Sequence, residues 1–122
     1  MPVYKLKSFA RFARSEAIAD ESLVEAVGRV TRGLIDADLG GGLIKQRVAR
    51  KGQRRSGGFR LMIAFRVGDF AVFLFGFAKS AEANLDDRQI TLLRGVAASW
   101  LSADAATIIR AVEQGELVKV LK

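Results

Sequence analysis

Large apolar residues occupy every second position from Phe59 to Val67, and the positions between them hold Arg60, Met62, Ala64 and Arg66. This period of two predicts a strand with one apolar face and two arginines on the other. Four further segments also have strand-like patterns: 3–7, 44–50, 71–79 and 116–121. Four others carry apolar residues three or four positions apart, as amphipathic helices do: 9–18, 22–33, 86–100 and 102–114. The pattern predicts one α+β domain over residues 1–122, with helices packed on a mostly antiparallel sheet of four or five strands. The predicted order is β-α-α-β-β-β-α-α-(β).

Local signals refine where these elements begin and end. Ser8 has the residue type and position of an N-cap for the first helix. Ser22 and Glu25 have the S-x-x-E spacing of a capping box for the second helix. Gly68 and Asp69 are predicted to form a two-residue hairpin connection, because glycine suits the first position of a type II′ turn.

The segment 71–79 is apolar on both of its alternating faces, which predicts a strand in the middle of the sheet. Phe73, Phe75 and Phe77 alternate with smaller residues and are expected to share a face. Phe73 and Phe75 favour the buried core. Phe77 has a second interpretation, as an aromatic ring on which nucleic-acid bases stack.

Positive charge is concentrated in one segment. The chain has 20 Lys and Arg against 13 Asp and Glu, and residues 39–68 hold eight of these cations without a carboxylate. Lys45 and Arg47 share one side of their strand, while Arg60 and Arg66 share the polar side of theirs. A hairpin of the two strands would gather these four cations on one surface, which suits a polyanion such as RNA or DNA. An acidic protein partner and a simply solvated basic hairpin remain open as alternatives.

The composition excludes several kinds of chemistry. The chain contains no cysteine and no histidine, so thiolate metal sites and catalysis that uses a histidine base are absent. We therefore expect no metal and no cofactor. The apolar run 70–78 is far shorter than the ~20 residues that span a bilayer. The first residues also lack the apolar core of a signal peptide, so we expect a cytoplasmic protein without a membrane partner.

The order of elements, together with LGGGLIKQRVARKGQRRSGGFR (39–60) and FLFGFAK (73–79), resembles the RelE/ParE superfamily of bacterial toxins. The likeness is closest to the HigB-like branch of type II toxin–antitoxin systems, and it covers about Val3 to Leu121. It implies an endoribonuclease that cleaves mRNA on the ribosome and inhibits translation, with a cognate antitoxin as partner. In this family the 2′-hydroxyl of the RNA attacks the neighbouring phosphate, and basic side chains of the toxin promote the attack.

The resemblance also implies which residues act. Lys45 and Arg47 match the basic residues on the second strand, Arg60 the arginine that begins the third, and Lys79 the basic residue that ends the fourth. Two departures are evident. Ser80 stands where relatives often have another cation, and Tyr4 is the only tyrosine, so the residue that protonates the leaving group is unassigned.

General chemistry supports these roles. Fixed guanidinium groups of Arg47 and Arg60 would stabilise the charge that develops on the phosphoryl oxygens. Lys45 is the candidate base, because neighbouring cations disfavour its protonated form. All of these cations are expected to be exposed, and hence to be needed for activity and not for folding. Further cations are expected to bind the RNA backbone: Arg50, Lys51, Arg54, Arg55 and Arg66.

Two other functions remain open at this stage. A toxin of the same fold could bind and inhibit DNA gyrase without cleaving anything, but such an inhibitor does not need cations converging on one face. A plain nucleic-acid-binding regulator is disfavoured, because no predicted helix has a basic face that would enter a major groove. An antitoxin is expected to cover the face of Lys45, Arg47 and Arg60 with an acidic or apolar segment, or to insert that segment against the helices.

Overall fold

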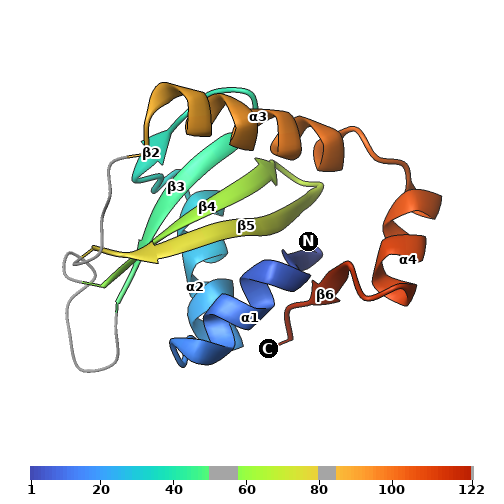
Figure 1. Ribbon diagram of the computed structural model, residues 1–122, viewed down its shortest axis with the longest axis horizontal. Coiled ribbons are helices and arrows are strands. Elements are labelled where there is room, and N and C mark those ends of the chain that lie inside the picture. Colours follow the sequence, from blue (N-terminus) through green and yellow to red (C-terminus); the bar gives the residue numbers. More distant parts are fainter. Residues whose placement is uncertain (50–57, 80–84, 122) are drawn as a thin grey trace.

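The computed structural model describes residues 1–49, 58–79 and 85–121 of the 122-residue chain. The described elements follow the predicted order, with one additional short strand (Figure 1). They are β1 (Val3–Leu6), α1 (Lys7–Ser15), α2 (Asp20–Thr31), β2 (Ala37–Asp38), β3 (Leu43–Val48), β4 (Phe59–Arg66), β5 (Phe70–Ala78), α3 (Asp87–Leu101), α4 (Ala105–Glu113) and β6 (Leu117–Lys119).

The strands form a single mixed sheet with the order β2-β3-β4-β5-β1-β6. Among the described pairs, β1 and β5 run parallel, and the remaining neighbours are antiparallel. This confirms the α+β class and the mostly antiparallel sheet. The sheet has six strands where four or five were predicted. The two-residue strand β2 was missed because it is too short to show a period in the sequence.

Helices cover the two faces of the sheet unequally. In Figure 1, α1 and α2 lie on one face and α3 on the other, while α4 lies beside β6. The core between the sheet and α1 and α2 includes Phe9, Leu23 and Leu61. The core under α3 and α4 includes Met62 and Leu101. Two opposite apolar layers explain why the middle strands β4 and β5 are apolar on both faces.

A β-bulge in β5 changes which side of the sheet its phenylalanines face. Met62 pairs with Phe75 and the next residue, Ile63, pairs with Phe73, so β5 holds one extra residue, Leu74. Phe73 is fully buried toward α1, whereas Phe75 is 42% exposed on the opposite side of the sheet. The prediction of a buried Phe73 is confirmed. The predictions that Phe75 is buried and that it shares a face with Phe73 are wrong, because one inserted residue reverses the alternation.

Two predicted helix caps are wrong. β1 continues directly into α1, whose N-cap is Leu6, so Ser8 lies inside the first turn. The second helix begins at Asp20 after Ala19, which places Ser22 within the helix and not at its cap.

The first residue of α2, Asp20, connects this helix to the sheet and to the end of the chain. The Asp20 carboxylate accepts hydrogen bonds from the Lys5 ammonium (2.8 Å) and the Leu121 N–H (2.9 Å). Burial would raise the pKa of Asp20, but these hydrogen bonds and the Lys5 charge lower it below its usual value.

The third helix begins close to its predicted start, and the β4–β5 hairpin differs from the prediction. Asp86 caps α3 in a capping box, in which its carboxylate accepts from the Gln89 N–H at 2.8 Å. The hairpin connection has three residues and not two, because Arg66 pairs with Phe70. Gly68, at its centre, has φ +73, a conformation that glycine adopts without strain.

In the described part of the chain, no single helix is long and apolar enough to cross a bilayer. The α3–α4 pair meets that test only when its two helices are joined, and these are bent by 106° at their junction.

Close packing at Gly76 in β5 provides a test of the fold. A Cβ atom there would lie 2.6 Å from Cε2 of Phe12 and 2.9 Å from Cδ2 of Leu61. We expect Gly76→Ala to lower the free energy of unfolding by about 1–3 kcal/mol, the usual effect of overpacking, in urea denaturation. Gly95→Ala on α3 is the control, because its added methyl group meets no atom within 4 Å apart from its own chain neighbours and the nearby backbone of its helix. That variant should gain up to about 1 kcal/mol from helix propensity. Equal stabilities of the two variants would contradict the packing of α1 on β5.

Candidate functional site

Three of the predicted cations meet on one face of the sheet, opposite to α1 and α2. In the β3–β4 pairing, Arg47 lies directly across from Arg60, and Lys45 lies across from Met62. Met62 belongs to the core on the α3 side, which identifies the face that these side chains occupy. Residues directly across an antiparallel pair have Cβ atoms about 5 Å apart, so the side chains of Arg47 and Arg60 start from neighbouring positions on this face.

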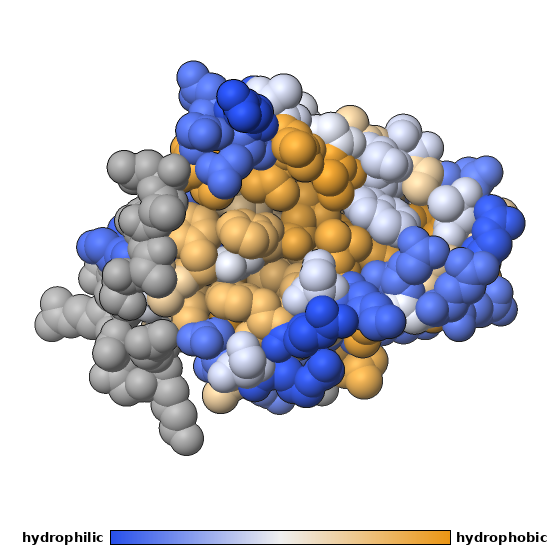
Figure 2. Space-filling model, viewed as in Figure 1, coloured by the Kyte–Doolittle hydropathy of each residue, from blue (hydrophilic) through white to orange (hydrophobic). Residues whose placement is uncertain are grey.

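Two aromatic rings lie beside these cations. Phe77 pairs directly with Arg60, and Phe75 pairs with Met62, so both rings are on the basic side of the sheet. Their ring centroids are 6.1 Å apart. Figure 2 shows apolar surface over β5 between α3 and α1, bordered by hydrophilic side chains. An exposed ring next to guanidinium groups is the combination that binds single-stranded nucleic acids, by stacking on bases and pairing with phosphates.

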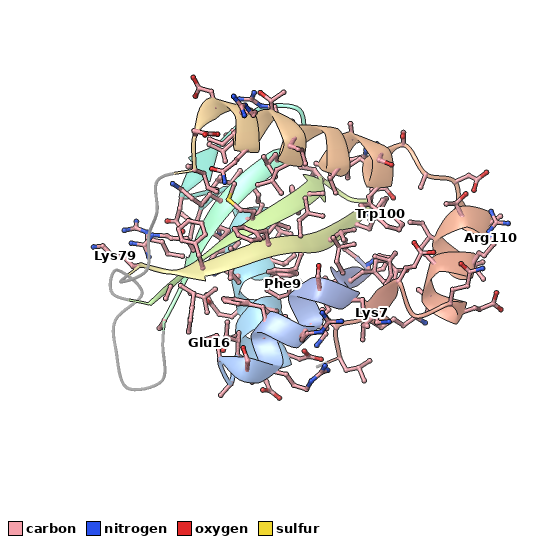
Figure 3. All side chains as sticks on the ribbon, in the orientation of Figure 1. Lys7, Phe9, Glu16, Lys79, Trp100 and Arg110 are labelled. Atoms are coloured by element: carbon pink, nitrogen blue, oxygen red, sulfur yellow. The ribbon has the colours of Figure 1, made fainter. Side chains whose placement is uncertain are left out.

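Lys79 lies at the same end of the sheet. It follows the last residue of β5, and its N–H donates to the carbonyl oxygen of Gly58 at 2.9 Å, next to the start of β4. Its side chain is exposed, and Figure 3 places it at the tip of β5. Three of the predicted catalytic residues therefore lie on adjacent strands, and Lys79 directly follows β5 at the same end of the sheet. This region is hereafter the basic–aromatic face: Lys45, Arg47, Arg60 and Lys79, with Phe75 and Phe77.

Exposure differs among these cations. Arg47 and Lys79 are exposed and Lys45 is partly buried, whereas Arg60 is only 7% exposed. The prediction that all four are exposed is therefore wrong for Arg60. The reason is its position on β4, a middle strand flanked on both sides by β3 and β5. A buried arginine contributes packing through its aliphatic stem as well as charge.

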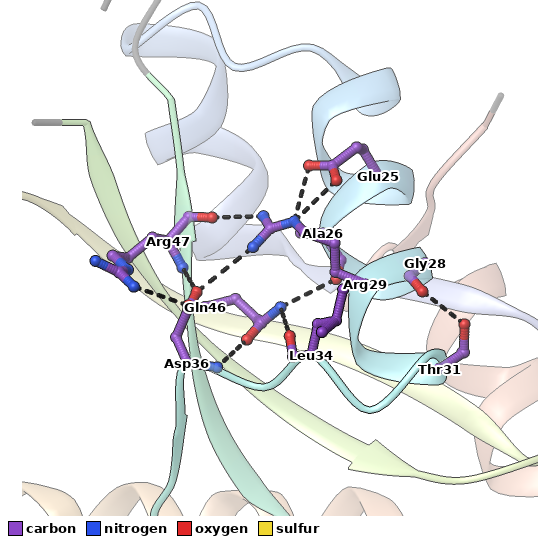
Figure 4. Close-up of polar contacts among 9 residues, drawn as sticks. All are labelled: Glu25, Ala26, Gly28, Arg29, Thr31, Leu34, Asp36, Gln46 and Arg47. Carbon is purple, nitrogen blue, oxygen red and sulfur yellow. Dashed lines mark hydrogen bonds and ion pairs between the residues drawn. The ribbon is translucent and has the colours of Figure 1, made fainter. Parts of the chain in front are cut away.

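Arg47 is held from outside the sheet by two charged residues (Figure 4). The Asp36 carboxylate accepts hydrogen bonds from the backbone N–H of Arg47 at 2.7 Å and from its Nη2 at 3.2 Å. Arg29 of α2 donates from Nη2 to the carbonyl oxygen of Arg47 at 2.5 Å. Burial would raise the pKa of Asp36, but the hydrogen bonds from Arg47 and the charges of Arg47 and Arg29 lower it below its usual value.

A buried glutamine anchors the same region from the other face of β3. Gln46 is fully buried, and its Oε1 accepts from the Asp36 N–H at 2.7 Å. Its Nε2 donates to the carbonyl oxygens of Ala26 and Leu34, each at 3.2 Å. The sequence analysis did not identify Arg29, Asp36 or Gln46. The sequence held one signal for this cluster: Gln46 lies between Ile44 and Val48 on the side of the strand that is expected to be buried. A buried polar side chain needs hydrogen-bond partners, so Gln46 indicated further polar groups nearby.

Of the predicted RNA-binding residues, only Arg66 lies in the described part of the chain, and it is not part of the basic–aromatic face. Arg66 lies at the far end of β4, six residues from Arg60, which corresponds to about 20 Å along a strand. Its guanidinium bonds to the Asp69 carboxylate at 2.8 Å and to the carbonyl oxygen of Leu101. The other four lie outside the described residues: Arg50, Lys51, Arg54 and Arg55.

The basic–aromatic face can bind and polarise a phosphodiester. Guanidinium groups match phosphate oxygens with paired donors. A lysine ammonium group acts as a point charge, and the neutral amine form of a lysine accepts a proton. Among the described residues, no cluster of three acidic side chains is placed to hold a metal ion.

Comparison with known proteins gives one clear match. A family model described as the RelE toxin of the RelE/RelB toxin–antitoxin system matches residues 1–120, nearly the whole chain. A search of curated proteins found no match.

Proposed function

Because this chain belongs to the RelE toxin family, it is a toxin of a toxin–antitoxin system, and we propose that it cleaves mRNA on the ribosome and thereby inhibits translation. Membership also implies a cognate antitoxin as its partner. We further propose a place in the HigB-like branch, on the strength of the 39–60 and 73–79 segments.

One observation carries the nuclease proposal: Arg47, Arg60 and the exposed ring of Phe75 share one face of three adjacent strands. Two guanidinium groups across from each other suit a phosphate, and a neighbouring ring suits the attached base. A rigid sheet holds both kinds of group at fixed spacing, and such preorganisation is how fixed charges stabilise a transition state.

The proposed reaction is an internal attack on phosphorus. The 2′-oxygen of the RNA forms a bond to the adjacent phosphorus as the bond to the 5′-oxygen of the next nucleotide breaks. The departing 5′-oxygen takes a proton from solvent water and leaves as a hydroxyl group. Lys45 takes the proton from the 2′-hydroxyl. Arg47 and Arg60 stabilise the charge on the phosphoryl oxygens, and Lys79 adds positive charge at the end of β5.

Other cations extend the proposed RNA contact. Arg50, Lys51, Arg54 and Arg55 adjoin β3 and β4 in sequence and are proposed to bind the backbone without reading its bases. Arg66 would meet a separate part of the RNA, about 20 Å from Arg60. We also propose that an acidic or apolar segment of the antitoxin covers the basic–aromatic face and so blocks the RNA.

Mapping the 5′ ends of mRNA after brief expression of the chain tests this function. We expect new 5′ ends inside translated regions, and we expect them to disappear when translation initiation is blocked. Lys45→Ala and Arg47→Ala should each remove these ends. A non-cleaving toxin that inhibits DNA gyrase is the alternative function. Loss of supercoiling by purified gyrase, with no new mRNA ends, would support it and contradict the nuclease.

A further inference from the structure

We propose that Asp36 is a positioning residue that fixes Arg47 for the cleavage reaction, with Arg29 as its support. The inference rests on the proposed nuclease function and assigns two residues to it that do not belong to the basic–aromatic face. Neither residue would touch RNA. Their effect would be exerted through the backbone and the guanidinium group of Arg47.

The first argument comes from the edge of the sheet. β2 pairs with β3 at Asp38–Ile44 and Ala37–Lys45, and the strand ends there. In an antiparallel pair, a longer β2 would next form backbone hydrogen bonds with Arg47 of β3. β2 does not extend that far, so these bonds are missing. The Asp36 carboxylate takes the place of the missing backbone acceptor at 2.7 Å, and the Arg29 guanidinium takes the place of the missing donor at 2.5 Å. Both backbone groups of Arg47 are thus fixed by charged side chains.

The second argument concerns the guanidinium group of Arg47. Its Nη2 donates to Oδ1 of Asp36 at 3.2 Å, while 46% of the side chain is exposed. An arginine has five N–H donors in a rigid plane. A carboxylate that holds one edge therefore orients the plane and leaves other donors for a phosphate. A long side chain without such a contact would populate many rotamers.

The support behind Asp36 is itself rigid. Arg29 is 4% exposed, and its Nε donates to the Glu25 carboxylate at 2.8 Å one helical turn away. Its Nη1 reaches Oδ2 of Asp36 at 3.5 Å. Gln46 binds the backbone N–H of Asp36 from the buried side of β3. Arg29 therefore holds the Asp36 carboxylate and Gln46 holds its backbone, so Arg47 loses little further freedom when RNA binds.

This role differs from mere structural support in its effect on RNA binding. A carboxylate 3.2 Å from Arg47 offsets part of its positive charge and weakens long-range attraction of RNA. Removing that negative charge should leave RNA binding equal or tighter. The same change releases the guanidinium and should slow the chemical step, because a misplacement of about 1 Å can cost about 100-fold in rate. In this variant the affinity for RNA should therefore stay equal or rise, while the rate of cleavage falls.

The test compares Asp36→Asn with Asp38→Asn. Asp38 is an exposed carboxylate on β2 that accepts from the Gly40 N–H and, within the described residues, makes no hydrogen bond to Arg47, so the control removes the same charge nearby. Binding is measured on programmed ribosomes with an mRNA that carries a 2′-deoxynucleotide at the cleavage site. The rate is measured in a single turnover with the cleavable mRNA. We expect Asp36→Asn to bind at least as tightly as the wild type and to cleave roughly 10–100 times more slowly. Asp38→Asn should cleave at the wild-type rate.

Two further measurements separate the possible failures. Combined with Arg47→Ala, Asp36→Asn should slow cleavage no further, because the residue that it positions is gone. The ¹⁵N–¹H signal of the Arg47 side chain reports directly whether its guanidinium is ordered, and we expect this signal to broaden in Asp36→Asn. If Asp36→Asn does not fold, Asp36→Glu replaces it. This variant keeps the charge, so binding should stay at the wild-type level while the rate falls.

The outcomes are distinguishable. A wild-type rate in Asp36→Asn, or losses of binding, rate and melting temperature in parallel, would overturn the positioning role. If the wild type itself does not cleave mRNA, the proposed function is wrong, and the Arg47 signal still decides the inference. Broadening in Asp36→Asn would support positioning by Asp36, and an unchanged signal would overturn it.

Discussion

Replacing Arg60 by alanine should abolish RNA cleavage and growth inhibition. Arg60 lies across from both Arg47 and Phe77, at the centre of the basic–aromatic face. Losing one fixed donor to a developing oxyanion costs roughly 2.7–4 kcal/mol of transition-state stabilisation, or about 100- to 1000-fold in rate. Single-turnover cleavage of mRNA on programmed ribosomes measures this loss. Because Arg60 is only 7% exposed, we also expect a lower melting temperature, so the assay must be run well below it.

Two controls separate charge from geometry and from stability in this experiment. Arg60→Lys keeps the charge but loses the planar fork, so it should cleave faster than the alanine variant and more slowly than the wild type. Arg110→Ala removes an exposed cation from α4 and should leave cleavage unchanged. If Arg60→Ala and Lys45→Ala both keep full activity, the basic–aromatic face is not the active site.

Two neighbouring phenylalanines of β5 should respond in opposite ways to truncation. Phe73 is fully buried, with its ring centroid 5.4 Å from that of Phe9. Phe73→Ala is expected to lower the free energy of unfolding by about 3–5 kcal/mol in urea denaturation. Phe75 lies two residues further along but is 42% exposed. Phe75→Ala should change the unfolding free energy far less and should weaken binding of 2′-deoxy-substituted mRNA by about 1–3 kcal/mol, the usual loss of one base stack.

This pair tests the bulge and the aromatic half of the site together. A large loss of stability in Phe75→Ala would mean that β5 alternates regularly and that the extra residue Leu74 is misplaced. A stable Phe75→Ala variant with normal RNA binding would leave the bulge intact but remove Phe75 from the proposed RNA contact.

The sequence by itself determined the class of fold and most of the basic surface. The period of two from Phe59 to Phe65 placed one side of β4 against α1 and α2 and put Arg60 on the other side, as the structure confirms. The same period placed Lys45 and Arg47 together on β3. Such patterns are reliable because burial of one face is a local property of a strand, readable from adjacent residues. The family was recognisable for the same reason, because its motifs lie within continuous segments.

Only the tertiary structure decided which groups complete the site. The bulge at Leu74 brought Phe75 to the basic–aromatic face, and an irregularity of one residue leaves no period in the sequence. Asp36 and Arg29 are 11 and 18 positions from Arg47, on segments that come together only when α2 packs on β3. Arg60 is buried on β4, which has a strand on each side. Arg66, at the far end of the same strand, forms an ion pair with Asp69. Hydrogen bonds and burial of this kind depend on contacts between distant segments, and these form only in the folded chain.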